Sequence, residues 1–203
     1  MGQIAAPYGF RIVKLSGDLP FSGGMHTFPL NANVGAFFFG DPVGLSGGAP
    51  TPLAGQPSAA VSVTSPIGIF MGAEYIDPVR GFVNSQSLQA NVLTAGLKSV
   101  KVKIADAPDV IMQIQANGSV TADKVGMNAA LIIGTGNVAT GNSTFALDSA
   151  SVAVTATLAL KIYDFVYNAA PSPGASSLPG DPFTDVLVQW NANIHRYNLG
   201  GGL

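Results

Sequence analysis

The chain has 203 residues, of which 47% are hydrophobic and only 10% are charged, and its formal net charge is -2 at pH 7. A typical soluble domain is about one-quarter charged, and a disordered chain is richer still in charge, so this composition excludes disorder for most of the chain. The lack of a basic excess argues against direct nucleic-acid binding. So few charges on an apolar chain predict a surface that is largely covered by partners, as in obligate oligomers.

Cysteine is absent, which excludes disulfides, thiolate catalysis and cysteine-ligated zinc. No apolar run reaches the roughly 18 residues of a membrane-spanning helix, so we expect no membrane partner. Residues 1–10 do not combine a basic region with an apolar stretch, so they do not read as a secretory signal. We therefore expect synthesis and assembly in a cytoplasm.

Glycine and proline interrupt the chain at short intervals, and the segments between them are rich in β-branched and aromatic residues. This pattern is typical of short strands joined by turns. In chain order, the expected strands are residues 10–15, 36–39, 59–64, 68–75, 100–104, 110–115, 152–162 and 184–194. They predict an all-β protein, either an antiparallel β-barrel or a β-sandwich, with long Gly/Pro-rich loops and little helix.

Two of these strands alternate clearly between apolar and polar residues. Val100, Val102 and Ile104 would face the core while the lysines between them face solvent, and residues 110–115 follow the same period of two. Asn117-Gly118 follows directly and predicts a tight hairpin, because both residues tolerate positive φ. Short helical turns are expected only near residues 123–130 and 148–152, where aspartate could cap a helix N-terminus.

The chain divides into three parts on this reading. Residues 1–15 would form an N-terminal arm or first strand, and residues 16–197 an all-β domain, with a subdivision near residue 90 left open. Residues 198–203 would be a flexible C-terminal tail. Extended loops are expected at residues 46–57 and 168–182, where proline and glycine recur.

Several motifs match catalytic or ligand-binding patterns, and we interpret each of them as a structural feature. Residues 132–139 match the G-x-G-x-x-A dinucleotide pattern, but no helix is expected after them, so we predict a loop and no cofactor. His26 and His195 have no neighbouring ligands in sequence, and we expect them at the surface or at an interface. Phe37 to Phe39 would form a buried strand rather than an exposed anchor. We expect no catalytic residue and no metal site, so the chain should not be an enzyme.

Several short segments, in order, resemble the head decoration or cement proteins of tailed bacteriophages. Pro7, Gly9 and Arg11 look like that family's opening Pro-x-Gly-x-Arg segment. The segments Gly40-Asp41-Pro42-Val43-Gly44-Leu45 and Gly68-Ile69-Phe70-Met71-Gly72-Ala73-Glu74-Tyr75 resemble later parts of the family. Further similarities lie at 110–116, 147–148, 158–162 and 186–193, whereas Phe37 to Phe39 and the 46–57 loop are particular to this chain.

The resemblance implies a structural virion protein on the outer capsid surface, where it would stabilise the phage head by bridging major capsid subunits. It also implies self-association, often as a homotrimer at three-fold or quasi-three-fold positions. The arm, residues 1–13, is the candidate capsid contact because Tyr8, Phe10 and Arg11 are residue types enriched in interfaces. The alternative is that Phe10 starts a core strand while Arg11 points into solvent.

A second hypothesis is a phage fibre or surface-binding β module that recognises host glycan. It requires aromatic side chains exposed on one face, and the chain has a single tryptophan, Trp190. Trp190 lies in an alternating strand, where burial is the simpler account. An enzyme is the third hypothesis, and no nucleophile, base and orienting group can be assembled from neighbouring positions.

Overall fold

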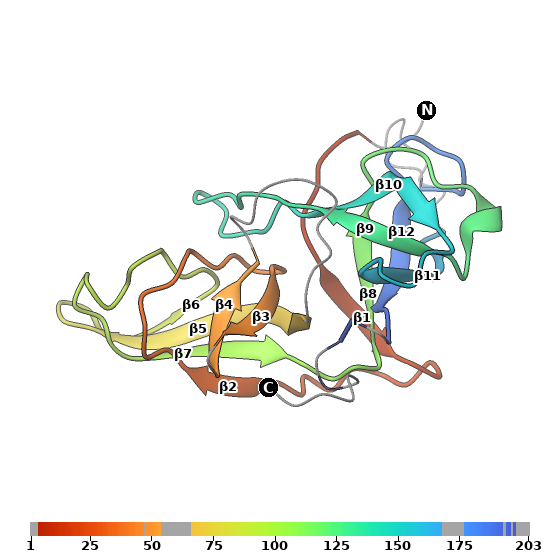
Figure 1. The fold of residues 1–203 in the computed structure, drawn as a ribbon. Helices are drawn as coiled ribbons and strands as arrows, with labels where there is room; N and C mark the ends of the chain where they lie inside the picture. The colour runs from red at the N-terminus through yellow and green to blue at the C-terminus, as the bar shows by residue number, and fades with distance from the viewer. Residues whose placement is uncertain are drawn as a thin grey trace.

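The computed structural model describes residues 4–46, 48–53, 66–167, 177–192, 194–195 and 197. Within these residues the protein is all-β, with twelve strands in two antiparallel six-stranded sheets. The arrangement is sandwich-like and is not a closed barrel. Figure 1 shows the two sheets in different halves of the molecule, which decides between the barrel and the sandwich expected from the sequence.

The first sheet has the strand order β2-β7-β5-β3-β4, with β6 paired to β5. The long strand β5 organises it: β7 pairs along one side of β5, and β3 and β6 share the other side. The strands are β2 (His26–Pro29), β3 (Pro42–Ser46), β4 (Ala49–Pro52), β5 (Pro66–Asp77), β6 (Gly81–Ser85) and β7 (Lys98–Ala105).

The second sheet has the order β1-β8-β12-β11-β9-β10. Its first strand comes from the start of the chain, and its other strands come from the second half. They are β1 (Arg11–Leu15), β8 (Val110–Gln115), β9 (Asn128–Ile132), β10 (Ala146–Ala153), β11 (Leu160–Phe165) and β12 (Asp185–Trp190). The one short helix in the described residues is a 3-10 turn, Ala122–Lys124.

Each sheet carries its own cluster of buried side chains. In the first sheet, Val100, Val102 and Ile104 point into a core that also contains Phe37 and Phe70. The second core is formed mainly by β8, β11 and β12, and it includes Met112, Ile114, Leu160, Ile162, Val188 and Trp190. The period-two pattern of β7 therefore predicted its buried face correctly. In β8, Val110, Met112 and Ile114 are buried as expected, but Ile111 and Gln115 on the opposite side are buried too, so β8 is not the half-buried strand that its alternation predicted.

Other strand predictions were wrong or incomplete. Residues 36–39 form no strand, and only Phe37 and Phe39 make isolated bridges, although Phe37 and Phe38 are buried as expected. The run 152–162 is interrupted by a turn after β10, and β11 starts only at Leu160. Residues 148–152 belong to β10 and are not helical. The predicted strand at 59–64 lies outside the described residues.

The loop predicted at 46–57 contains the strand β4, whose two prolines are accommodated because β4 is an edge strand. The Asn117-Gly118 hairpin is also wrong, because the neighbours of β8 are β1 and β12 rather than the next strand in sequence. Asn117 instead accepts hydrogen bonds from the main chain and side chain of Ser149. Asn117, which predicted a local turn, therefore makes a contact between segments that are distant in sequence.

The chain passes from the first sheet to the second between β7 and β8, whereas residue 90 lies between β6 and β7 of the first sheet. Because β1 belongs to the second sheet, the N-terminal segment spans both halves. The predicted tail at 198–203 lies outside the described residues.

Main-chain hydrogen bonds join the two halves at one junction. The amide of Phe10 donates to the carbonyl of Gly40 at 3.0 Å, the amide of Gly40 donates to the carbonyl of Phe70 at 2.9 Å, and the amide of Phe70 donates to the carbonyl of Asp41 at 2.8 Å. Residues of the segments 7–13, 40–45 and 68–75 therefore meet at this junction.

Candidate interaction surface

Phe10 is a core residue. Its side chain is fully buried, and its ring lies 5.3 Å from that of Trp190 between centroids. A side chain in this position has no surface to offer a partner, so Phe10 is withdrawn from the predicted capsid contacts. The alternative prediction, that Phe10 is a core residue at the start of the first strand, agrees with this position.

Tyr8 and Arg11 lie together beside β12. The guanidinium carbon of Arg11 lies 4.3 Å from the centre of the Tyr8 ring, and the Tyr8 hydroxyl donates a 2.9 Å hydrogen bond to Asp185. Burial, followed by the negative charge of Asp185, raises the pKa of Tyr8 well above its usual value. Arg11 is exposed and Tyr8 is half-buried, so this pair keeps some accessible surface.

The described part of the arm before Tyr8 is held against the second sheet. The side-chain oxygen of Gln115 accepts a 2.8 Å hydrogen bond from the amide of Ala6, and its side-chain nitrogen donates a 3.3 Å bond to the carbonyl of Ile4. Residues 4–7 remain exposed all the same, with Ile4 at 72%. This segment is attached to the domain at one side and open to solvent at the other.

Among the described residues, the most exposed apolar group lies elsewhere, at the hairpin joining β5 and β6. Asp77 accepts hydrogen bonds from the amides of Val79 and Arg80 at 2.8 and 2.9 Å, and Gly81 has φ +78°, so Asp77-Pro78-Val79-Arg80-Gly81 closes a tight turn. This turn lies at the end of the first sheet farther from the second sheet, at the left of Figure 1.

Three apolar side chains project around this turn, which we call the hairpin tip (residues 76–82). Val79 is 90% exposed, Phe82 is 67% exposed, and Ile76 is 44% exposed. Ile76 and Phe82 are directly paired across the two strands. Turn positions normally carry polar residues, so an apolar tip of this kind is typical of a surface that a partner covers.

A second group missed by sequence reasoning gathers around Asp106, in the segment between the two sheets. His26 Nδ1 lies 2.5 Å from an Asp106 carboxylate oxygen, and the Tyr197 hydroxyl donates a 3.0 Å hydrogen bond to the same oxygen. The three residues are separated by at least 80 positions in sequence, and so no local pattern could reveal them. They join β2 to the C-terminal segment.

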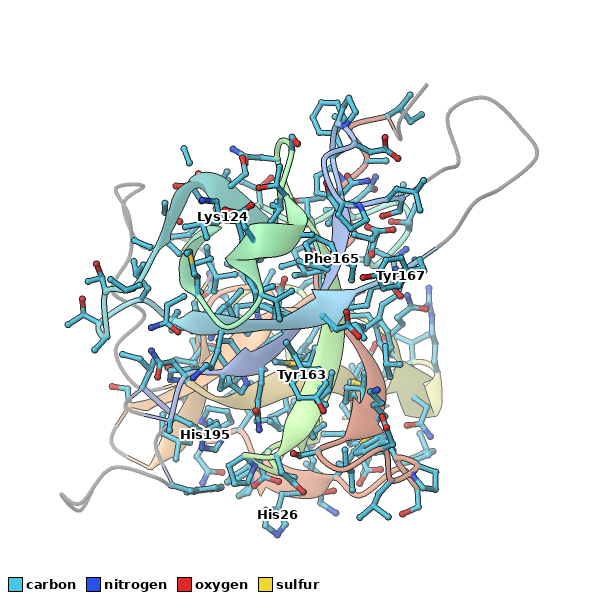
Figure 2. The ribbon with its side chains drawn as sticks, turned by 90° about the vertical axis from the view of Figure 1, so that its right-hand side faces the viewer. His26, Lys124, Tyr163, Phe165, Tyr167 and His195 are labelled. Carbon is cyan, nitrogen blue, oxygen red and sulfur yellow. The ribbon has the colours of Figure 1, made fainter. Side chains whose placement is uncertain are left out.

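The two histidines differ from each other. His26 is exposed, as expected, whereas His195 is fully buried within the chain, so the prediction that it lies at the surface or at an interface is wrong. Both are labelled in Figure 2. His195 Nε2 lies 3.0 Å from the carbonyl of Ile67 and its Nδ1 accepts a bond from the amide of Tyr197. Because a carbonyl only accepts, Nε2 carries the proton, and burial lowers the pKa of this imidazole.

The G-x-G-x-x-A segment is a loop, as predicted. Gly136 has φ +73°, and a Cβ atom placed there would lie 2.0 Å from the Phe38 ring. Its glycine is explained by packing against a buried aromatic ring rather than by the approach of a pyrophosphate. Among the described residues, no group of three or more His, Cys, Asp or Glu side chains is placed to bind a metal ion.

Comparisons with protein-family models, with curated proteins and with solved structures gave no match to this chain. No helix in the described part of the structure has the length and apolar character needed to cross a bilayer. Interpretation of the surface therefore depends on the residues themselves, and among these the hairpin tip is the clearest candidate contact.

Proposed function

We propose that this protein is a structural virion protein that decorates the outside of a bacteriophage capsid and stabilises the head by bridging major capsid subunits. The observation that carries the proposal is the apolar hairpin tip, with Val79 at 90% and Phe82 at 67% exposure, on a chain with only 10% charged residues. The resemblance of residues 7–13, 40–45 and 68–75 to decoration proteins supplies the kind of partner.

The mechanism requires no chemistry. Apolar surface contributes about 25 cal/mol per Å² when it is removed from water, so a repeated small contact opposes the outward pressure of packaged DNA. Binding of several copies to a symmetric shell increases the effect through high effective concentration. Self-association as a homotrimer would place three tips at one three-fold position, and sedimentation of the free and the shell-bound protein measures that stoichiometry.

The test mixes the purified protein with expanded, undecorated phage shells and measures saturable co-sedimentation and the temperature at which the shells burst. We expect saturation and a higher bursting temperature. A protein that neither binds nor strengthens any matching shell would contradict the proposal.

Variants of the hairpin tip and of the N-terminal arm test which of the two contacts the shell. Val79→Asn with Phe82→Thr should weaken shell binding more than tenfold, because burying a Phe side chain contributes about 1.5–3 kcal/mol. Val154→Asn is the matched control, since Val154 is 84% exposed but lies directly after β10, at the second sheet. Deletion of residues 1–7 tests the arm separately, with unfolding measurements to show that the fold is intact.

A surface module that recognises host glycan is the second candidate, because β11 places tyrosines at the surface. Tyr163 is 39% exposed and Tyr167, two residues beyond the strand, is 66% exposed (Figure 2). Aromatic rings of this kind can stack on sugars, but the Lys14 ammonium lies 5.5 Å from the centre of the Tyr163 ring. Glycan-array binding that is lost in Tyr167→Ala, together with no shell binding, would favour this function.

A further inference from the structure

A groove opens beside the hairpin tip, at the same end of the first sheet. Its volume is about 500 Å³, and its lining consists of Pro29, Leu30, Asn31, Leu93, Leu97 and β7 residues 98–101. Leu30 is buried at its base, while Leu93 and Leu97 are only partly buried. The groove therefore offers apolar contacts on one side and the polar side of a strand on the other.

The pairing of β2 with β7 stops before β7 does. The last paired residues are Pro29 and Lys101, and the amide of Leu30 then donates to the carbonyl of Val100 at 2.9 Å. Strand β7 begins three positions earlier, at Lys98. The groove lies beside this extension, where Ser99 has φ +50° and the Val100 carbonyl is already occupied by Leu30, so the side chains rather than a free strand edge line the groove.

Charge at this end opposes the charge of the whole chain. Among the described residues, Arg80, Lys98 and Lys101 lie here with only Glu74 and Asp77 as carboxylates, although the formal net charge of the chain is -2. Lys101 and Lys103 share Glu74 at 3.5 and 3.2 Å. Among the described residues, Lys98 makes no ion pair and is exposed at the groove.

The groove and the hairpin tip are adjacent. Ile76 of the tip is the register partner of Lys98 in the groove. An occupant must then supply negative charge toward Lys98 and Lys101 and an apolar side chain toward Leu93 and Leu97.

We propose that this groove binds an extended acidic segment of a partner protein, with an apolar side chain placed between Leu93 and Leu97 and carboxylates facing Lys98 and Lys101. The inference deepens the proposed function, and in that setting the capsid subunit supplies the segment. The apolar contact with Leu93 and Leu97 gives affinity, and the charged contacts with Lys98 and Lys101 give specificity.

The first test reverses the charge of the groove. Lys98→Glu with Lys101→Glu should weaken binding to expanded undecorated shells at least tenfold at about 50 mM salt, and wild-type binding should weaken at about 500 mM salt. Lys124→Glu with Lys161→Glu makes the same change in net charge in the 3-10 turn and on β11, away from the first sheet, and should alter affinity less than twofold. Equal losses in both pairs, or no loss in the groove pair, would overturn the inference.

The second test does not involve a shell. A labelled peptide of alternating glutamate and leucine is titrated into the wild-type protein and into both variant pairs, with thermal unfolding as the check on folding. Wild type and the control pair should bind it, and the groove pair should not. No peptide binding by the wild type, or equal competition by a single-stranded oligonucleotide, would overturn the groove assignment, whereas peptide binding without shell binding would reject only the capsid role.

Discussion

The carboxylate of Asp41 accepts a 2.8 Å hydrogen bond from the main-chain amide of Phe38, inside the junction between the two sheets. Its other oxygen, Oδ1, is buried and has no hydrogen-bond partner among the described residues. The side chain is fully buried, and this burial raises the pKa of Asp41 from 3.8 to about 6, against the lowering effects of Ser143 and the Phe38 amide.

Replacing Asp41 with Asn should stabilise the protein near pH 7.5. The folded state favours the protonated acid, so its stabilising contribution is complete below about pH 3.8 and is lost as the pH rises through about 6. We expect Asp41→Asn to raise the free energy of unfolding by about 2 kcal/mol at pH 7.5 and by much less at pH 4. Urea unfolding at both values measures this, and an equal gain at the two pH values would show that titration is not the cause.

His195 should produce the opposite pH dependence. Burial lowers its pKa below the ordinary 6.5, against the raising effects of the Ile67 hydrogen bond and the Asp106 charge, so its stabilising contribution is present above that value and is lost as the pH falls through the folded-state pKa. In the Asp41→Asn background, stability should therefore decline from pH 7.5 to pH 5. Adding His195→Gln, whose amide can still donate to the Ile67 carbonyl, should reduce this decline, measured as the melting temperature at each pH. An unchanged decline would show that His195 is not the group responsible.

Gly40→Ala should be far more disruptive than Gly17→Ala. Both glycines have positive φ, +87° and +79°, so both substitutions carry the backbone cost of about 1 kcal/mol. A Cβ at Gly40 would also lie 2.6 Å from the Phe10 carbonyl oxygen, whereas one at Gly17 meets no atom within 4 Å. We expect a loss of about 3 kcal/mol or more at Gly40, measured by urea unfolding. Similar losses at both positions would contradict the close approach.

Phe10→Ala should cost about 3–5 kcal/mol of unfolding free energy, because it leaves a cavity against Trp190. Trp190 is the only tryptophan in the sequence, so its fluorescence reports on this site directly. Arg11→Ala removes only the exposed contact with Tyr8 and should change stability by less than about 1 kcal/mol. If the two variants lost equal stability with no change in fluorescence, the core position of Phe10 would be wrong.

The buried faces were the most predictable part of the fold. Val100, Val102 and Ile104 alternate with lysines along the middle of β7, and this period is set by the pleat of the backbone alone. Strands that lacked such alternation were missed: β4 carries two prolines, which only its edge position allows. The pairing of Asn117 with Ser149 instead of a hairpin shows tertiary contacts overriding a local turn preference.

The candidate contact residues were harder to predict from the sequence. Phe10 and Arg11 are both interface-type residues, and only the packing against Trp190 separates a core side chain from an exposed one. The hairpin tip did leave a signal, because Val79 follows Asp-Pro at a turn where polar residues are usual. The cluster of His26, Asp106 and Tyr197 left none, since it depends on how three distant segments meet.

The position of β1 also has a consequence for the order of folding. Residues 26–105 contain every strand of the first sheet, so a growing chain can complete that sheet while the second half is still being synthesised. Strand β1 can pair only after β8, about one hundred residues later in the chain, has been synthesised. Contacts between residues so far apart in sequence form slowly, and we expect docking of the N-terminal segment to be one of the slow steps by which a newly made copy becomes competent to bind.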